Sequence, residues 1–225
     1  MKETKKTEKV VGIAIFSALA VVVALVCNVI PPVAGFLSLD VKDAVITVAA
    51  LIYGPVSAVA ISFIAALIEL ITFSTTGWYG FIMNFVSSTF FSLTVSIIYS
   101  KRRTLNTAII ACFAGVAVTT GAMLLMNIFV TPLYLSYIGV QGDVNGQVMG
   151  MLPTILLPFN FAKTLLNSAT VLLIYKPVAI ALARTGVSKK ETRDNLKFTR
   201  SSLVITVVGA ASMLVAIGVL LIISL

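Results

Sequence analysis

A lysine lies inside one of the long apolar stretches of this chain, and two asparagines flank it at helical spacing. Lys163 stands in the sequence LLPFNFAKTLLNS, with Asn160 three residues before it and Asn167 four residues after it. This spacing puts the three side chains on one face of a helix. A lysine costs about 2.5 to 3.5 kcal/mol at the centre of a membrane helix and occurs there mainly where it has a function or a partner. The pattern therefore predicts a polar site around Lys163.

Three other polar residues are expected at the depth of Lys163. Asn127 lies near the end of the fifth apolar run, Asn84 near the start of the fourth, and Glu69 near the end of the third. Apolar walls with a few polar groups suit a flat, hydrogen-bonding ligand. Alternatives remain open, because Glu69 could pair with Lys163 or reach the surface, and Asn84 could join two helices. Asn167 lies deeper and is expected to bond a neighbouring helix.

The composition places these residues in a membrane protein. The chain has 225 residues, 59% of them apolar and 11% charged, and its mean hydropathy is +1.09. Its long apolar runs do not alternate as barrel strands do, so they are predicted to span the bilayer as helices. We expect an all-α integral membrane protein.

Seven apolar runs are assigned as spans, on the measure that about 20 residues cross a bilayer. The runs are 10–30, 44–53, 56–73, 78–99, 107–130, 155–183 and 202–225. The second is too short to cross alone and is expected to pack against protein, before a turn at Gly54 and Pro55. The chain is thus divided into a basic head (1–9), a six-span membrane domain that holds the predicted polar site (10–183), a basic linker (184–201) and a seventh transmembrane helix (202–225).

The net charge of +8 is explained by topology rather than by nucleic-acid binding. Of the sixteen Lys and Arg residues, all but Lys42 and Lys163 fall in segments 2–9, 101–103 and 176–200. The positive-inside rule then predicts a multi-pass protein of the cell membrane with a cytoplasmic N-terminus. Lys42 is left in the first outer loop. The outer connection 131–154 is long enough to be a lid or binding loop, although an unstructured linker is the alternative.

Several chemistries have no residues to support them. The chain has no histidine, the commonest general base and metal ligand. It also has no GxxxxGK[ST] motif, so any use of ATP would depend on a partner. Its two cysteines lie in separate apolar runs without metal-ligand spacing. We therefore predict neither an enzyme nor a metal site.

Small residues on the first apolar run could support close helix contact. Ala14 and Ala18 form an AxxxA pattern, continued by Ala20 and Ala24. Alanines four residues apart let two helices approach closely. Ordinary packing within the protein is the alternative reading.

Five segments together resemble the riboflavin-specific S components of energy-coupling factor (ECF) transporters. They are FLSLDVKD in the first loop, LIYGP at the second turn, MNF in the fourth run, NIFVTPLY after the fifth and PFNFAK opening the sixth. The last two are the most specific, and the resemblance covers residues 10–183.

The resemblance implies a six-helix domain that binds riboflavin from outside, capped by the first and fifth loops. It would assemble with a transmembrane coupling subunit and two cytoplasmic ATPases, and rock as a whole to carry its cargo inward. Riboflavin would be transported cargo and not a cofactor. Asn127, Asn160 and Lys163 match ligand-contacting positions that would bond the polar edge of the isoalloxazine. Leu39, Asp40 and Asn84 lie in matching segments and are expected as further contacts, and Ala14 and Ala18 would dock on the coupling subunit.

The C-terminal tail departs from the resemblance, because family members usually stop after the sixth span. Alternatives to riboflavin import also remain. The chain could be an S component for thiamine, folate or biotin, or a transporter supplying flavin outside the cell. It could also be a membrane assembly protein in which Lys163 only bridges helices.

Overall fold

The computed structural model describes residues 2–184 and 200–224, so most of the predicted linker lies outside the described residues. Described residues form helices joined by short connections, with one isolated bridge between Val33 and Leu37. The α-helices are α1 (Lys2–Cys27), α2 (Lys42–Tyr53), α3 (Pro55–Thr72), α4 (Gly77–Lys101), α5 (Leu105–Tyr137), α6 (Val144–Met151), α7 (Leu157–Arg184) and α9 (Arg200–Ser224). A short π-helical turn, η1 (Leu152–Leu156), joins α6 to α7.

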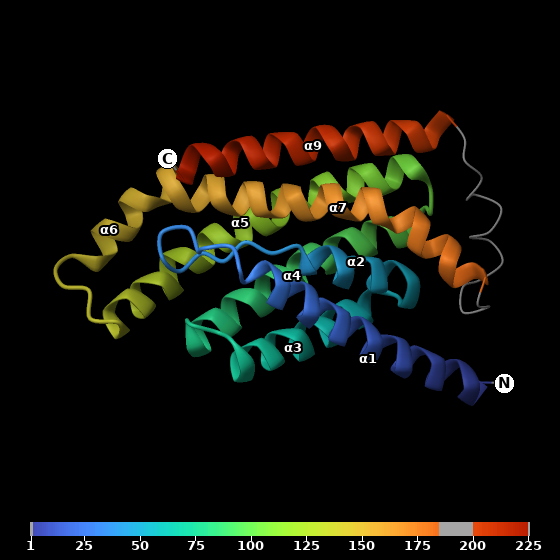
Figure 1. The fold of residues 1–225 in the computed structure, drawn as a ribbon, viewed down its shortest axis with the longest axis horizontal. Helices are drawn as coiled ribbons and strands as arrows, with labels where there is room; N and C mark the ends of the chain where they lie inside the picture. The colour runs from blue at the N-terminus through green and yellow to red at the C-terminus, as the bar shows by residue number, and fades with distance from the viewer. Residues whose placement is uncertain (1, 185–199, 225) are drawn as a thin grey trace.

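The short helix α2 is the centre of the bundle. Its ten residues from Lys42 to Leu51 are all buried, and it packs against α1, α3, α4 and α7. Twelve helical residues extend only about 18 Å, well short of the hydrocarbon thickness of about 30 Å. The connection 28–41 makes up the difference, since it enters the bundle at the α6 end and α2 continues towards the end where the N-terminus lies (Figure 1). The prediction that this run is short and covered by protein is confirmed.

A sharp turn joins α2 to α3 as the sequence predicts. Gly54 has a φ of 95°, a conformation that glycine adopts without steric cost, and its N–H donates to the Ala50 carbonyl. Pro55 opens α3, where its missing N–H is not needed. The two helices are therefore antiparallel neighbours.

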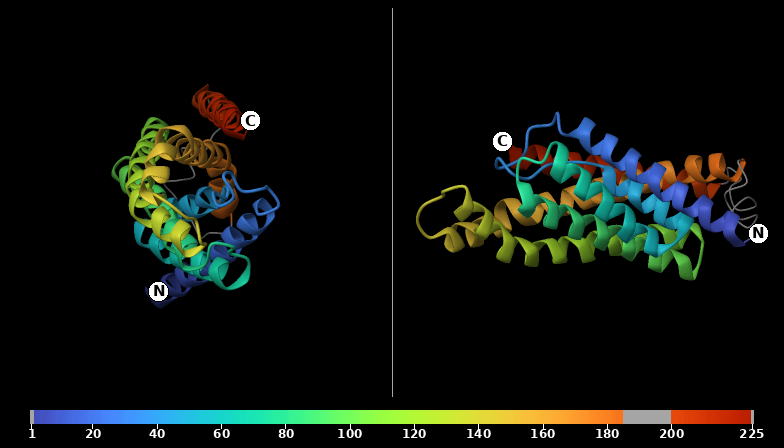
Figure 2. Two further views of the ribbon diagram at one scale, coloured as in Figure 1. Left: turned by 90° about the vertical axis from the view of Figure 1, so that its left-hand side faces the viewer. Right: turned by 90° about the horizontal axis from the view of Figure 1, so that it is seen from below.

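The described residues contain six helical segments that are long and apolar enough to cross a membrane, and α2 is the short exception. This confirms an all-α membrane protein with a bundle of six helices and an additional C-terminal helix. Figure 2 shows α1 and α9 on opposite sides of the bundle. α9 lies along α7, and a Cβ added at Gly209 would come within 3.1 Å of Leu173 and 3.3 Å of the Ala169 carbonyl.

The connection 131–154 is mostly helical, so the prediction of a long loop is wrong in that respect. α5 continues through Pro132 to Tyr137, and α6 begins at Val144, where the Asp143 carboxylate accepts from the Gly146 N–H at 2.9 Å. Only residues 138–143 are outside helices. Apolar residues of this segment, including Leu135 and Val148, are buried in a cluster with Leu37 of the first loop. Burial of this apolar surface favours order at the α6 end.

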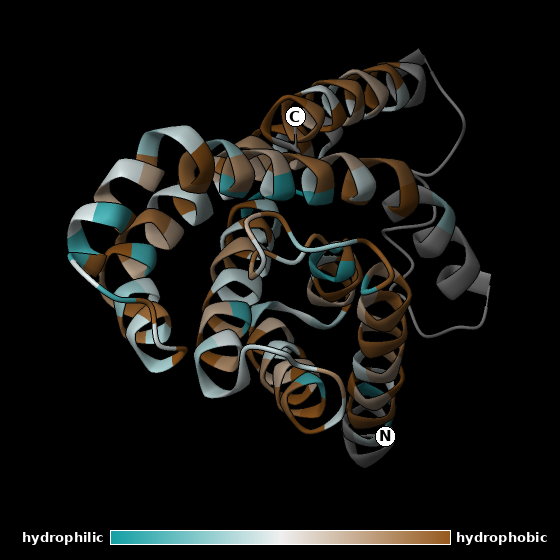
Figure 3. Cartoon of the chain, turned by 60° about the vertical axis from the view of Figure 1, so that its left-hand side comes forward, coloured by the Kyte–Doolittle hydropathy of each residue, from teal (hydrophilic) through white to brown (hydrophobic). Residues whose placement is uncertain are grey.

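The lipid-facing surface is apolar, as expected for spanning helices. Figure 3 shows α1 and α9 as mostly hydrophobic, and large side chains such as Val10 and Leu214 are more than half exposed. The α4–α5 connection lies at the N-terminal end of the bundle (Figure 1), where Arg102 and Arg103 are exposed.

Candidate functional site

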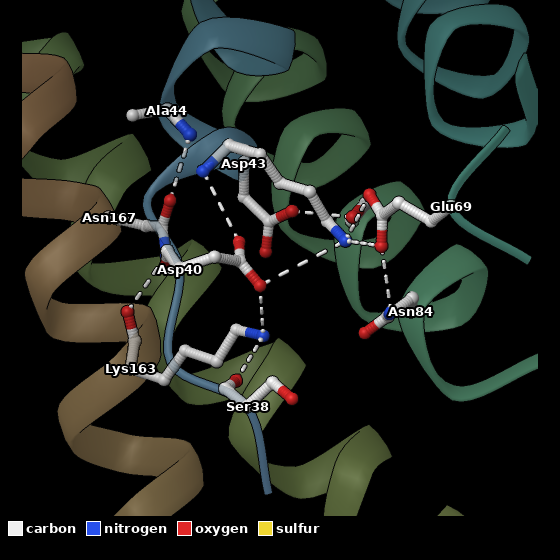
Figure 4. A network of polar contacts seen from close by, with 10 residues as sticks. Ser38, Asp40, Asp43, Ala44, Glu69, Asn84, Lys163 and Asn167 are labelled. Atoms are coloured by element: carbon white, nitrogen blue, oxygen red, sulfur yellow. Dashed lines mark hydrogen bonds and ion pairs between the residues drawn. The ribbon is translucent and has the colours of Figure 1, made fainter. Parts of the chain in front are cut away.

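Lys163 points into the bundle, where it has an acidic partner. Its Nζ donates to Asp40 Oδ2 at 2.8 Å and to the Ser38 carbonyl at 3.1 Å, and only 7% of the residue is exposed. Both partners come from the first connection. The ammonium is therefore neutralised by a segment that enters the bundle beside α7 (Figure 4).

A second buried ion pair lies next to the first. The Lys42 Nζ lies 2.6 Å from both carboxylate oxygens of Glu69 and 3.9 Å from Asp40 Oδ2. Asn84 Nδ2 donates to Glu69 Oε2 at 3.0 Å. Lys42 is 2% exposed and Glu69 is 4% exposed. Charges so deeply buried require partners.

These contacts correct the prediction for Lys42 and exclude both alternatives that were open for Glu69. Lys42 begins the central helix α2 and is buried there, so it does not lie in the predicted outer loop. Glu69 pairs with Lys42, and neither with Lys163 nor at the surface. A twelve-residue apolar helix with charges at its start is the signal that could have indicated buried ion pairs.

Asn167 joins the first connection and α2 to α7. Its Nδ2 donates to the Asp40 carbonyl at 2.9 Å, and its Oδ1 accepts from the Ala44 N–H at 2.9 Å. The predicted bond from Asn167 to a neighbouring helix is confirmed. Beside it, Ser88 of α4 donates to the Asp43 carboxylate. The start of α2 is thus held by α3, α4 and α7.

A cavity lies beside this polar cluster. It is lined by Phe36, Leu37, Ser38, Thr76, Tyr79, Gly80, Met83, Asn84, Ser87, Met123, Asn127, Val130, Thr131, Tyr134, Phe159, Asn160 and Lys163. The mixture of apolar walls with a few polar groups is typical of small-molecule sites.

Four of the six predicted substrate-binding residues line this cavity together, namely Asn84, Asn127, Asn160 and Lys163. The other two lie outside its lining. Asp40 is behind Lys163, and Leu39 packs against two apolar clusters. The sequence does not predict the apolar and aromatic residues of the lining, because no periodicity distinguishes residues facing a cavity from those facing a neighbouring helix.

Internal hydrogen bonds fix how the amides face the cavity. Asn160 Nδ2 donates to the Leu156 carbonyl at 2.7 Å, and Asn127 Nδ2 donates to the Met123 carbonyl at 2.7 Å. A carbonyl can only accept, so these contacts establish which amide atom is nitrogen. Asn127 Oδ1 accepts from Thr131, whereas the Oδ1 of Asn160 has no donor among the described residues. Asn160 can therefore accept a hydrogen bond from a ligand.

Aromatic rings from three elements meet beside the cavity. Phe36 of the first connection lies 5.9 Å from Tyr134 of α5, and Tyr79 of α4 lies 5.8 Å from Tyr134, between ring centroids. All three line the cavity. They offer flat surfaces against which a planar ligand could pack.

The predicted docking residues lie on the outer face of α1. Ala14 and Ala18 are exposed. Ala20 and Ala24 are buried, so the prediction that they continue the same face is wrong. Ala20 and Ala24 follow Ala14 and Ala18 by six residues, which is not a whole number of helical turns, so their side chains point in a different direction.

Comparison with known proteins shows where the chain is similar to others. The family model "ECF transporter, substrate-specific component" matches residues 8–175. Riboflavin transporter RibU of Staphylococcus aureus is 26% identical over 80% of this chain and 95% of its own length. FmnP of Bacillus subtilis, also called a riboflavin transporter, is 24% identical over 76% of this chain and 91% of its own length.

A solved structure has the same fold. It is titled "Structure and mechanism of the S component of a bacterial ECF transporter", has a TM-score of 0.64, and is 26% identical. The match covers 98% of that chain and 79% of this one. The family match ends before α9 begins.

Proposed function

Because this chain belongs to the family of substrate-specific components of ECF transporters, we propose that its cavity binds riboflavin for import. The chain is a transport component and not an enzyme. The observation that carries the proposal is the convergence of Lys163 and three asparagines on one cavity with apolar walls. Relatives named as riboflavin transporters supply the identity of the cargo.

The polar atoms of the cavity suit the polar edge of a flavin. That edge has an N–H donor between two carbonyl acceptors. The Oδ1 atoms of Asn84 and Asn160 can accept from the N–H, and the remaining N–H of the Lys163 ammonium can donate to a carbonyl. The walls formed by Met83, Met123 and other apolar residues suit the flat ring system.

Two predicted residues support the site indirectly in this proposal. Asp40 holds Lys163 at 2.8 Å and neutralises it, so a neutral vitamin can bind without leaving a buried charge unpaired. Leu39 packs against the apolar cluster that contains Leu37 and Phe159, two residues of the cavity lining, and so helps to hold the first connection in place.

Members of this family associate with an ECF module, and the assembly proposed here is a transmembrane coupling subunit with two cytoplasmic ATPases. The exposed face with Ala14 and Ala18 would dock on the coupling subunit, and the basic α4–α5 connection favours a cytoplasmic N-terminus. The whole subunit would then rock to carry the cavity inward. α9 lies on the opposite side of the bundle and leaves α1 accessible (Figure 2).

Purification of the full chain in detergent tests the proposal. We expect a yellow protein that releases about one flavin per chain, and that binds riboflavin but not thiamine in an equilibrium titration. The Lys163→Ala variant should bind riboflavin far more weakly, and Lys101→Ala, at the exposed end of α4, should keep the affinity of the unmodified chain. A colourless protein without flavin affinity would instead support a role in membrane assembly.

A further inference from the structure

A buried carboxylate lies one layer behind the cavity wall and contacts a residue of that wall. Glu69 is outside the cavity lining, whereas Asn84 is part of it. The Asn84 Nδ2 donates to Glu69 Oε2 at 3.0 Å. The proposed function uses Asn84 but gives no role to Glu69.

The chemistry of Glu69 determines the orientation of Asn84. An ionised carboxylate can only accept, so Asn84 must turn its NH₂ group towards Glu69. Its Oδ1 then points away from Glu69, as Figure 4 shows. Without the carboxylate, the amide could turn by 180° and present donors to the cavity instead.

Glu69 is itself paired with a cation. Lys42 contacts both of its oxygens at 2.6 Å and also lies 3.9 Å from Asp40, which holds Lys163. Asn84, Glu69, Lys42, Asp40 and Lys163 therefore form one connected series, with two positive and two negative charges. An acceptor lies at one end of the series and a donor at the other.

We infer that Glu69, held by Lys42, is a positioning residue that fixes Asn84 as a hydrogen-bond acceptor in the cavity. The site thereby selects a cargo that presents an N–H or O–H to Asn84. This inference deepens the proposed function and rests on it. A merely structural Lys42–Glu69 pair would affect folding but would leave the hydrogen-bonding preference of the cavity unchanged.

A double-mutant cycle on riboflavin affinity tests the inference. The purified full chain is compared with Glu69→Gln, Asn84→Ala and the double variant, by fluorescence titration with riboflavin. Glu69→Gln should weaken binding about tenfold, the effect of one hydrogen bond to a correctly oriented group. In the Asn84→Ala background the same change should have almost no further effect. Equal losses in both backgrounds would overturn the inference.

A neutral pair guards against misfolding, because Glu69→Gln leaves the buried Lys42 unpaired. Lys42→Gln with Glu69→Gln carries no charge, and its two amides can still bond each other. We expect this protein to fold, to bind riboflavin more weakly, and to lose that difference when Asn84→Ala is added. Wild-type affinity in the neutral pair would contradict the inference. Failure of the unmodified chain to bind riboflavin would contradict the proposed function itself.

Discussion

The charged side chains gathered around the start of α2 form ion pairs with one another, whereas the amides of the neighbouring cavity have polar atoms available for a ligand. Lys42, Glu69, Asp40 and Lys163 form ion pairs within 2.6 to 2.8 Å, and these residues are less than 8% exposed. Asn160 and Asn84 each use an N–H internally, and no donor among the described residues contacts either Oδ1. Both regions contain buried polar side chains, but the ion pairs are bonded within the protein, whereas the amides have an oxygen that can still accept a hydrogen bond.

The comparison teaches which residues should affect folding and which should affect binding. Removing one partner of a buried ion pair leaves an uncompensated charge, which costs about 3 to 5 kcal/mol. Removing an amide that bonds both the protein and the ligand costs closer to one hydrogen bond. Lys163 belongs to both regions.

Lys42→Ala should have the largest effect on stability. It leaves the Glu69 carboxylate buried without its cation, and we expect a loss of about 3 to 5 kcal/mol in the free energy of unfolding. Thermal unfolding in detergent measures it, with the exposed Lys101→Ala as the control. A Tm equal to that of the control would break the distinction between the two regions.

Lys163→Ala should weaken riboflavin binding about a hundredfold. The variant loses a charged donor, and charged hydrogen bonds contribute about 1.5 to 3 kcal/mol each. Stability should also fall, because Asp40 loses its 2.8 Å partner. Titration of the folded fraction separates the two effects. A lower Tm with unchanged riboflavin affinity would assign Lys163 to the ion-pair region alone.

Asn160→Ala should weaken riboflavin binding about tenfold with little change in Tm, since its protein bond is a local one to Leu156. Asn167→Ala provides the matched comparison on the same helix. It should lower the Tm instead, because Asn167 joins the first connection to α7. Similar effects of the two variants on both measurements would contradict the comparison.

Leucine at Ala14 and Ala18 should change neither riboflavin affinity nor Tm, because both positions are exposed and far in sequence from either region. The larger side chains should block close helix approach and so reduce co-purification with the ECF module. Ile15→Leu, another exposed position on α1, is the control. Undiminished co-purification would place the docking surface elsewhere.

The pattern around Lys163 was informative because charge is rare in apolar helices. Hydropathy predicted the membrane helices, and helical spacing placed Asn160 and Lys163 on one cavity wall. The turn at Gly54 followed from residue types whose backbone preferences are local.

Long-range pairing was beyond the reach of sequence reasoning. The charges in FLSLDVKD are typical of an exposed loop, and only the partners supplied by α3 and α7 explain their burial. In the same way, residues 131–154 contain glycines typical of loops, and their helices pack through distant contacts such as that with Leu37. A local pattern such as the charges at the start of α2 can indicate that buried partners exist, but it does not identify them.

A structure of the chain bound to riboflavin is the most direct test. The account predicts the isoalloxazine inside the cavity, with its polar edge within about 3 Å of Lys163 Nζ and of the Oδ1 atoms of Asn84 and Asn160. A cavity that stays empty at saturating riboflavin, or a flavin bound outside it, would contradict the account.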